Sequence, residues 1–386
     1  MVDKLKAMYK QVYGEKVDAV FFAPGRVNLI GEHTDYNGGN VFPCALTFGT
    51  YALVKKRNDK KIRFYSENFK NIGIIELNID DIEYNKKHDW ANYPKGVIWS
   101  FKSNGMEIDS GFDILFYGNI PNGAGLSSSA SIEVVMGVVL KDLYNFNINM
   151  IDIALRSKEA ENKFIGVNCG IMDQFAVAMG KKDCAILLDT NKLKYQYVKI
   201  KLNKASIVIS NTNKQRGLTD SKYNERRSQC ETALECLQTK LDISFLCQID
   251  EKQFEENKYL IKDDVCSRRA KHVIYENQRT LKAVKALENK DLELFGKLMN
   301  ESHISLRDDY EVTGIELDTL VEIAWKSEGV IGSRMTGAGF GGCTVSIVKD
   351  EFIDDFIKNV SEKYKKKIGY DAIFYIAQIG DGARKI

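Results

Sequence analysis

The chain has 386 residues, and its 55 Lys and Arg against 53 Asp and Glu give a formal net charge of +2. With 44% hydrophobic and 28% charged residues it has the composition of a folded globular protein, which excludes a disordered chain. The balanced charge gives no reason to expect a nucleic-acid surface or a polybasic membrane surface, and no apolar run approaches the ~20 residues of a membrane helix.

The compartment is predicted from the start of the chain and from its cysteines. Charged residues interrupt the first ten positions, where a secretory signal would be apolar, so we expect a cytoplasmic protein. The eight cysteines include no Cys-x-x-Cys pair, and we interpret them as reduced thiols. The four histidines are widely spaced, which argues against a structural zinc site.

Apolar periodicity predicts the elements in chain order. A helix ending near Gly14 precedes extended segments at residues 19–23, 50–54, 62–65, 72–79 and 112–117. Helices follow at residues 132–143, 151–165 and 171–179, and then a strand at residues 184–188. Beyond residue 200 helices predominate, at residues 221–237, 267–287, 291–299 and 317–325, before strands at residues 343–348 and 373–379 that flank another helix.

Strands and helices in blocks, rather than in regular alternation, predict an α+β fold. We expect two domains, residues 1–200 and 201–386, with the boundary in the polar stretch at residues 190–204. A return of the last strand to the first domain is the alternative.

The first motif, residues 25–39, reads Gly-Arg-Val-Asn-Leu-Ile-Gly-Glu-His-Thr-Asp-Tyr-Asn-Gly-Gly. It places Arg26, Glu32, His33 and Asp35 within ten residues and among four glycines. Ionised carboxylates form strong hydrogen bonds with hydroxyls, so the pattern suits a sugar. A polar surface loop with turn glycines is the alternative.

The second motif, residues 118–130, lies between a predicted strand and the strongest predicted helix. Glycines before a helix let backbone N–H groups and the helix N-terminus hold an anion. No lysine follows, so this is not the usual P-loop. A serine N-cap is the alternative, but a cap needs one serine, and three serines with three glycines favour phosphate binding.

Two further segments carry weaker signals. Residues 336–343 contain Gly-x-Gly-x-x-Gly, but a strand rather than a helix follows, which argues against dinucleotide binding. A second glycine-rich wall of an active site or a tight turn remains. Asp173 falls in the first turn of a predicted helix, where a capping charge is the common explanation.

Together these segments resemble the galactokinase family, in the superfamily that also holds homoserine, mevalonate and phosphomevalonate kinases. Residues 25–39 are similar to the family signature almost letter for letter, and the loops at residues 121–130 and 337–342 are shared across the superfamily. The resemblance implies an N-terminal ribosomal-protein-S5-like α+β domain and a C-terminal ferredoxin-like α+β domain, with the active site in the cleft between them. It implies ATP- and Mg²⁺-dependent phosphorylation of D-galactose at the anomeric hydroxyl, the first step of galactose catabolism, and no nucleic acid, membrane or protein partner.

The resemblance also implies roles for single residues. Asp173 would be the catalytic base or an orienting acceptor, and Arg26 would stabilise the transferring phosphoryl group. The implied sugar-binding residues are Glu32, His33, Thr34, Asp35, Gly170 and Tyr223. The implied nucleotide-binding residues are Ser66, Gly123, Ala124, Gly125, Leu126, Ser127, Ser128 and Ser129. Ser129 and Glu161 would hold Mg²⁺, although the helix pattern alone reads Glu161 as a solvated charge.

Two other functions are compatible with the same motifs. A kinase for N-acetylgalactosamine or another related sugar is the nearest alternative, and the intact residues 33–36 favour galactose over it. A non-catalytic sugar sensor is the alternative from another class. The unbroken serines at residues 127–129 and the presence of Asp173 favour catalysis.

Overall fold

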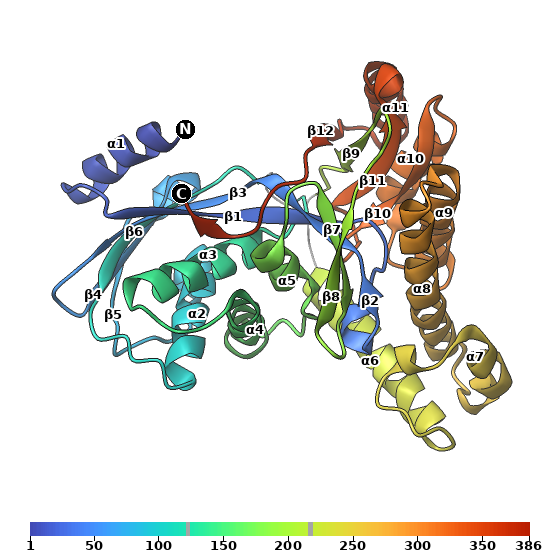
Figure 1. Cartoon of the computed structure of the whole chain (residues 1–386), viewed down its shortest axis with the longest axis horizontal. Helices are drawn as coiled ribbons and strands as arrows, with labels where there is room; N and C mark the ends of the chain where they lie inside the picture. The colour runs from blue at the N-terminus through green and yellow to red at the C-terminus, as the bar shows by residue number, and fades with distance from the viewer. Residues whose placement is uncertain (121–123, 215–218) are drawn as a thin grey trace.

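The computed structural model describes residues 1–120, 124–214 and 219–386 (Figure 1). Its first sheet has the strand order β13-β1-β3-β6-β4-β5, in which β4 and β6 run parallel and the other neighbours antiparallel. The bounds are β1 Ala19–Asn28, β3 Pro43–Lys56, β4 Lys61–Ser66, β5 Ile75–Asn78, β6 Phe112–Gly118 and β13 Arg384–Lys385.

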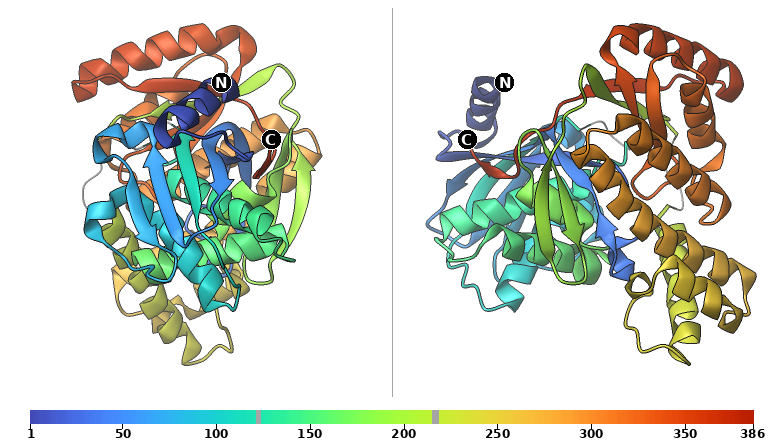
Figure 2. Two further views of the ribbon diagram at one scale, coloured as in Figure 1. Left: turned by 90° about the vertical axis from the view of Figure 1, so that its left-hand side faces the viewer. Right: turned by 45° about the vertical axis from the view of Figure 1, so that its right-hand side comes forward.

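Helices cover both faces of this sheet (Figures 1 and 2). They are α1 (Val2–Tyr13) on one face and α2 (Asn92–Ser103), α3 (Ser128–Leu143), α4 (Met150–Glu159) and α5 (Met172–Met179) on the other. Side chains alternate along β1, so that Val20 packs under α1 while Phe21 packs toward α3. The sheet is therefore buried on both sides.

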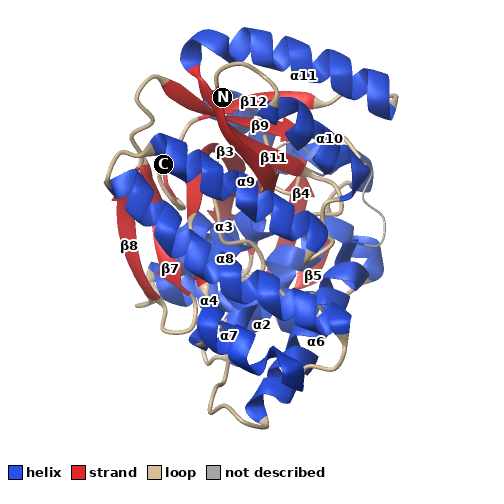
Figure 3. Cartoon of the chain, turned by 90° about the vertical axis from the view of Figure 1, so that its right-hand side faces the viewer, coloured by secondary structure: helices blue, strands red, loops and turns tan. Residues whose placement is uncertain are grey.

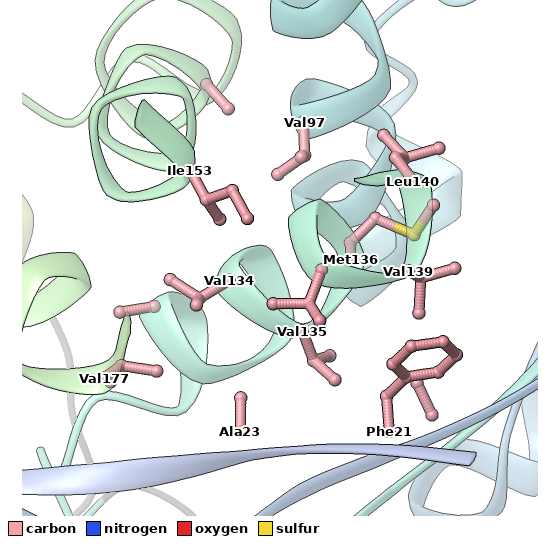
Figure 4. Packing of buried hydrophobic residues seen from close by; sticks show 14 of the residues in the cluster. Phe21, Ala23, Val97, Val134, Val135, Met136, Val139, Leu140, Ile153 and Val177 are labelled. Atoms are coloured by element: carbon pink, nitrogen blue, oxygen red, sulfur yellow. The ribbon is translucent and has the colours of Figure 1, made fainter. Parts of the chain in front are cut away.

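Helix α3 is the central helix of the larger core. Figure 4 shows Val135 and Val139 on the side of Phe21 in β1, with Val97 of α2 and Ile153 of α4 on the opposite side. All five side chains are fully buried. This packing fixes the start of α3 close to the polar end of β1.

The second sheet is antiparallel, with the order β10-β11-β9-β12. Its strands are β9 Ala205–Asn211, β10 Val330–Thr336, β11 Cys343–Lys349 and β12 Ile373–Ala377. The accompanying helices, seen side-on in Figure 3, are α6 Thr219–Gln238, α7 Glu251–Asn257, α8 Asp264–Glu288, α9 Leu292–Asp308, α10 Gly314–Trp325 and α11 Ile353–Ile368. A small third sheet holds β2 Asn40–Val41, β7 Cys184–Asp189 and β8 Lys194–Lys199. The expected α+β fold is confirmed.

The structure extends one predicted strand into the first motif. We expected the strand to stop at residue 23, but β1 continues to Asn28, and nearly all of it is buried. The pairing of β1 with β3 shifts its register between Pro24 and Arg26. Arg26 is therefore a buried strand residue rather than part of a surface loop.

Other differences follow from where polar residues lie. The polar stretch at residues 190–204 contains β8, an edge strand of which only Val198 is buried, so its sequence lacks an apolar alternation. Strands β9 and β10 and helices α2 and α7 were not predicted. The segment at residues 72–79 is a strand only at Ile75–Asn78, and the helix at residues 151–165 ends in a π-helix, Ala160–Ile165.

Strand β13 returns the chain to the first sheet. Phe21 pairs with Lys385 and Phe22 with Arg384. Strand β13 is thus the edge strand beside β1 in the first sheet, although the strand before it in the chain, β12, belongs to the second sheet. Among the described residues, no helix combines the length and the apolar character needed to cross a membrane.

Leu140→Ala tests the packing around α3. Leu140 is fully buried, so the shortened side chain should lower the free energy of unfolding by ~2–5 kcal/mol. The matched control is Ile315→Ala, because Ile315 is 61% exposed and should change stability by less than about 0.5 kcal/mol. Chemical denaturation measures both. Equal losses would contradict a core centred on α3.

Candidate active site

A cleft of about 260 Å³ lies between the two halves of the chain. Its lining residues are Arg26, Glu32, His33, Asp35, Tyr93, Gly125, Ser127, Ser128, Ser129, Glu161, Val167, Cys169, Gly170, Met172, Asp173, Tyr223, Gly337 and Ala338. The two weaker segments of the sequence analysis thus meet the two stronger ones here. Gly337 and Ala338 form a wall of the cleft. This agrees with one of the two interpretations of the glycine-rich segment at residues 336–343.

Arg26 and Asp173 form a bidentate ion pair between the end of β1 and the start of α5. Arg26 Nε donates to Asp173 Oδ1 and Nη2 donates to Oδ2, each at 2.8 Å. The third nitrogen, Nη1, donates to the carbonyl oxygen of Gly125 at 2.8 Å. The Asp173 side chain is 30% exposed while that of Arg26 is 4% exposed. The carboxylate therefore faces the cleft and the guanidinium supports it from below.

Ser127 connects this pair to α3. Its backbone is in the left-handed region, with φ 62°, and its hydroxyl donates to Asp173 Oδ2 at 2.5 Å. The Ser127 side chain makes no capping hydrogen bond to α3. The first N–H groups of the helix, beside Ser128 and Ser129, consequently remain available to an anion in the cleft.

Asp35 lies directly against the backbone at Gly170. A Cβ atom on residue 170 would come within 1.8 Å of Asp35 Oδ2, so no larger residue fits without moving the carboxylate. The N–H of Met172 donates to the same oxygen at 3.3 Å. Burial and the neighbouring Asp173 carboxylate raise the pKa of Asp35 to about 6. Asp35 is thus a partly buried acceptor whose charge is lost in mildly acidic solution.

Glu32 is anchored through one oxygen. Its Oε1 accepts hydrogen bonds from Gly337 N at 2.8 Å and Arg334 Nη1 at 3.3 Å. Thr336 Oγ1 also lies 3.1 Å from Oε1, although the carbonyl oxygen of Asn28 is a nearer acceptor for its proton, at 2.9 Å. The residue is 1% exposed and still lines the cleft. The glycine-rich loop after β10 therefore supports Glu32 as well as forming a wall.

Aromatic rings close the cleft around His33. The ring centroids of His33 and Tyr223 are 5.6 Å apart, and those of Tyr36 and Tyr223 are 5.4 Å apart. Tyr36 Oη lies 2.8 Å from His33 Nδ1. Burial, with a smaller contribution from nearby His272, lowers the pKa of His33 to about 3, so its ring is neutral at physiological pH.

Several residues expected at the site do not reach the cleft. Thr34 points into its own loop, where its hydroxyl lies within hydrogen-bond distance of the carbonyl oxygens of Gly31 and Asn40. Ala124 and Leu126 are buried in the core beneath the cleft rather than lining it. Gly123 lies outside the described residues.

Glu161 belongs to a buried set of polar side chains that the sequence analysis only partly identified. Its Oε2 accepts a hydrogen bond from Gln174 Nε2 at 2.5 Å, and Gln174 Nε2 also lies 3.1 Å from Oε2 of the fully buried Glu133. Burial and the charge of Asp173 raise the pKa of Glu161 to about 7. Glu133 and Gln174 were missed. The available signal was a glutamate inside the apolar run of the helix at residues 132–143.

A second pocket of about 250 Å³ adjoins the cleft and shares Tyr93, Ser128 and Ser129 with it. Ser66 lines this pocket together with the aromatic side chains of Phe69 and Trp90. The Ser66 hydroxyl accepts a hydrogen bond from Asn68 N at 3.3 Å. The pocket thus has an aromatic lining and reaches the start of α3.

Comparisons with known proteins agree on one family. Residues 7–56 match the model of the galactokinase galactose-binding signature, and residues 92–181 and 283–366 match the N-terminal and C-terminal models of the GHMP kinases. A galactokinase of Clostridium beijerinckii is 65% identical over 385 residues, covering 100% of this chain and 99% of the relative. The crystal structure of Lactococcus lactis galactokinase complexed with galactose superposes with a TM-score of 0.98, at 49% identity and full coverage of both chains. A Methanococcus jannaschii mevalonate kinase, 20% identical, shares the fold with a TM-score of 0.67 over 94% of this chain and 98% of that one.

The Asp35 carboxyl group should titrate near pH 6 in the folded protein, as followed by carbon NMR of labelled aspartate. Asp173→Asn should lower the pKa of Asp35 toward the ordinary value of about 4, because a like charge is removed and Arg26 becomes unbalanced. The control is Asp59→Asn, which removes an exposed aspartate and should leave the titration of Asp35 unchanged. A pKa near 4 in the unmodified protein would contradict this description of the site.

Proposed function

The chain belongs to the galactokinase family, and we propose that this cleft transfers the γ-phosphoryl group of ATP to the anomeric hydroxyl of D-galactose, giving α-D-galactose 1-phosphate. One observation carries the proposal for the site. The Arg26–Asp173 pair faces the acceptors Asp35 and Glu32 at the N-terminus of α3. Sugar acceptors, a proton acceptor and an anion site are thus within one cleft.

The sugar lies against the loop after β1. Asp35 and Glu32 accept hydrogen bonds from sugar hydroxyls, and the neutral His33 ring adds a polar contact. Gly170 contributes by letting Asp35 approach, and Tyr223 positions the sugar ring. Thr34 acts indirectly in this scheme, because its hydroxyl holds the loop together.

Asp173 receives the proton of the anomeric hydroxyl as the oxygen attacks the γ-phosphorus. The bond from that phosphorus to the ADP oxygen breaks, and the charge leaves with ADP. A carboxylate is a weak base toward a sugar hydroxyl, but in a loose transition state the proton leaves late, so a well-placed carboxylate suffices. Arg26 holds both oxygens of Asp173 and lies beside the transferring group, where its charge stabilises it.

The ATP phosphates lie at the start of α3. Unused N–H groups and the hydroxyls of Ser128 and Ser129 are available there, and Ser127 joins this loop to Asp173. Residues 124–126 supply backbone groups, of which Gly125 also binds Arg26. The aromatic pocket lined by Ser66 takes the base of the nucleotide.

The donors near α3 fit a magnesium ion. Mg²⁺ prefers oxygen ligands and is usually held by one or two protein groups together with substrate phosphates. Glu161 and Ser129 both line the cleft. A side-chain hydrogen bond from Ser129 lowers the pKa of Glu161, against the larger effect of burial. When bound, Mg²⁺ neutralises charge on the phosphate oxygens. Gln174 holds the Glu161 carboxylate in place for it.

We extend the proposal to domain organisation and compartment. Residues 1–200 form a sugar- and phosphate-binding domain, and residues 201–386 form a second domain with the loop at residues 337–342. Strand β13 is grouped with the first domain because it pairs with β1. The eight cysteines are all free, which supports a reducing compartment and hence the cytoplasm.

A coupled assay of ADP release against a panel of free sugars tests the proposed substrate. Galactose should be phosphorylated well, and glucose should be at least ~10⁴-fold worse in kcat/KM, because inverting the 4-hydroxyl leaves buried acceptors unpaired. Asp35→Ala should cut kcat/KM for galactose at least ~100-fold while the KM for ATP changes little. A preference for glucose or N-acetylgalactosamine would contradict the specificity and leave phosphoryl transfer standing.

Asp173→Asn should lower turnover by ~10²–10⁴-fold, because it removes the proton acceptor and keeps the shape. Binding of galactose and ATP, followed by calorimetry, should persist. Asp142→Asn on the surface is the matched control and should leave turnover unchanged. A variant at residue 173 that retains a tenth of the original turnover would rule out the proposed role.

Glu161→Gln and Ser129→Ala should each raise the Mg²⁺ concentration needed for half-maximal turnover at fixed ATP. Glu159→Gln is the matched control for the first, because Glu159 lies two residues away and binds Ser100 and Lys163 instead of facing the cleft. Unchanged magnesium titrations in both variants would remove these two residues from the proposed metal site.

A further inference from the structure

Glu32 rests on a network of buried charges that lies behind the cleft. Its main partner is Arg334 of β10, with Nη1 at 3.3 Å from Oε1, and the two side chains are 0% and 1% exposed. Ions withdrawn from water this completely are stable only when their remaining hydrogen-bonding positions are filled. Around Arg334, Nε and Nη1 have hydrogen-bond partners, while Nη2 has only the charge of Glu276 beside it.

Besides Glu32, the guanidinium of Arg334 faces three partners. Its Nε donates to Ser302 Oγ of α9 at 3.1 Å, and its Nη1 also lies 3.3 Å from the carbonyl oxygen of Asn28 at the end of β1. Its Nη2 lies 3.9 Å from Glu276 Oε1 of α8. Only an arginine offers donors in a fixed planar fork that spans such a set.

Glu276 forms the other side of the network and contacts the loop after β1, residues 29–39, which we call the sugar loop. Its Oε1 accepts a hydrogen bond from the backbone N–H of Gly31 at 3.0 Å and one from Ser302 Oγ at 2.6 Å. Its Oε2 pairs with Arg279. Although burial raises the pKa of Glu276, the charges of Arg279 and Arg334 outweigh it and lower the pKa to about 2. The side chain is therefore an anion held against the loop.

Two hydrogen bonds hold the segment from Gly31 to Glu32 in place. Glu276 holds the backbone N–H before Glu32, and Arg334 holds the Glu32 carboxylate. Oε1 already accepts hydrogen bonds from Gly337 N and Arg334 Nη1, which use its two lone pairs, so Oε2 is the oxygen left for a ligand. These two hydrogen bonds therefore fix the direction in which Glu32 Oε2 points.

We propose that Arg334 and Glu276 are positioning residues for galactose: they orient Glu32 so that Oε2 accepts a sugar hydroxyl. This proposal rests on the proposed function, because it takes Glu32 as a sugar contact. Neither residue is among the described residues that line the cleft. Beside the proposed phosphate site, Arg26 and Ser127 make their side-chain hydrogen bonds to Asp173 and Gly125 rather than to Arg334 or Glu276. The effect of the network should therefore fall on the sugar and spare ATP.

Arg334→Lys tests the proposal, because it keeps the charge and removes the fork. We expect the KM for galactose to rise at least about tenfold, on the scale of a lost charged hydrogen bond, while the KM for ATP stays within about twofold. Glu276→Gln should give the same split. It supplies a second measurement if the lysine variant does not fold.

The matched control is Arg269→Lys. Arg269 of α8 is 2% exposed and binds Gln229, the carbonyl oxygen of Asp309 and Glu311, none of which belongs to the loop at residues 29–39. It should lower the melting temperature without changing the KM for galactose. A rise in the galactose KM equal to that of Arg334→Lys would show a general effect of buried arginines and would overturn the proposal.

A double-mutant cycle with Glu32→Gln separates positioning from stability. If Arg334 acts through Glu32, Arg334→Lys should change the galactose KM by less than about twofold once Glu32 is already Gln. Fully additive effects, an unchanged galactose KM, or equal losses for galactose and ATP would each overturn the proposal. If the unmodified protein itself failed to phosphorylate galactose, the proposed function would fail instead, which keeps the two results distinct.

Discussion

The ion pair between Arg26 and Asp173 is the contact on which the arrangement of the cleft depends. It joins a strand to a helix that lies far along the chain, and both charged-group hydrogen bonds measure 2.8 Å. Ser127 and Gly125 bind the same pair from the start of α3, so three elements share one electrostatic centre. Moving any of them would separate the proton acceptor from the anion site.

The cleft concentrates more negative charge than a stable interior favours. Asp35 and Glu161 both have a raised pKa because they are buried near Asp173, and the buried Glu133 has a pKa raised well above its ordinary value. Burying like charges close together lowers the stability of the folded protein. In the proposed function, the same carboxylates bind hydroxyls and a cation, which explains why the cleft contains them. Arg26, buried beneath Asp173, offsets part of this charge.

The sequence predicts the parts of this molecule whose chemistry is local. Arg26 and Asp35 stand out because one short motif holds them among other polar residues, and long helices such as α3 follow from periodicity. Asp173 by itself suggests only a helix-capping charge, and its expected role came from the family resemblance. Contacts between segments that are distant in the chain could not be predicted from the sequence. Arg334 lies 302 residues from its partner Glu32, and neither apolar pattern nor spacing connects them. The edge strand β8 was missed because solvent, rather than a core, covers most of its side chains.

Strand β13 has a consequence for how the protein is made. It covers an edge of β1 through the pairs Phe21–Lys385 and Phe22–Arg384, and Ile386 N donates to the carbonyl oxygen of Val20 at 2.9 Å. On the ribosome β1 emerges first and β13 long afterwards, so this row of backbone groups stays open while the rest of the chain is synthesised. An open strand edge is a template for pairing with another chain. Late closure by β13 therefore sets the period in which nascent chains are most exposed to self-association.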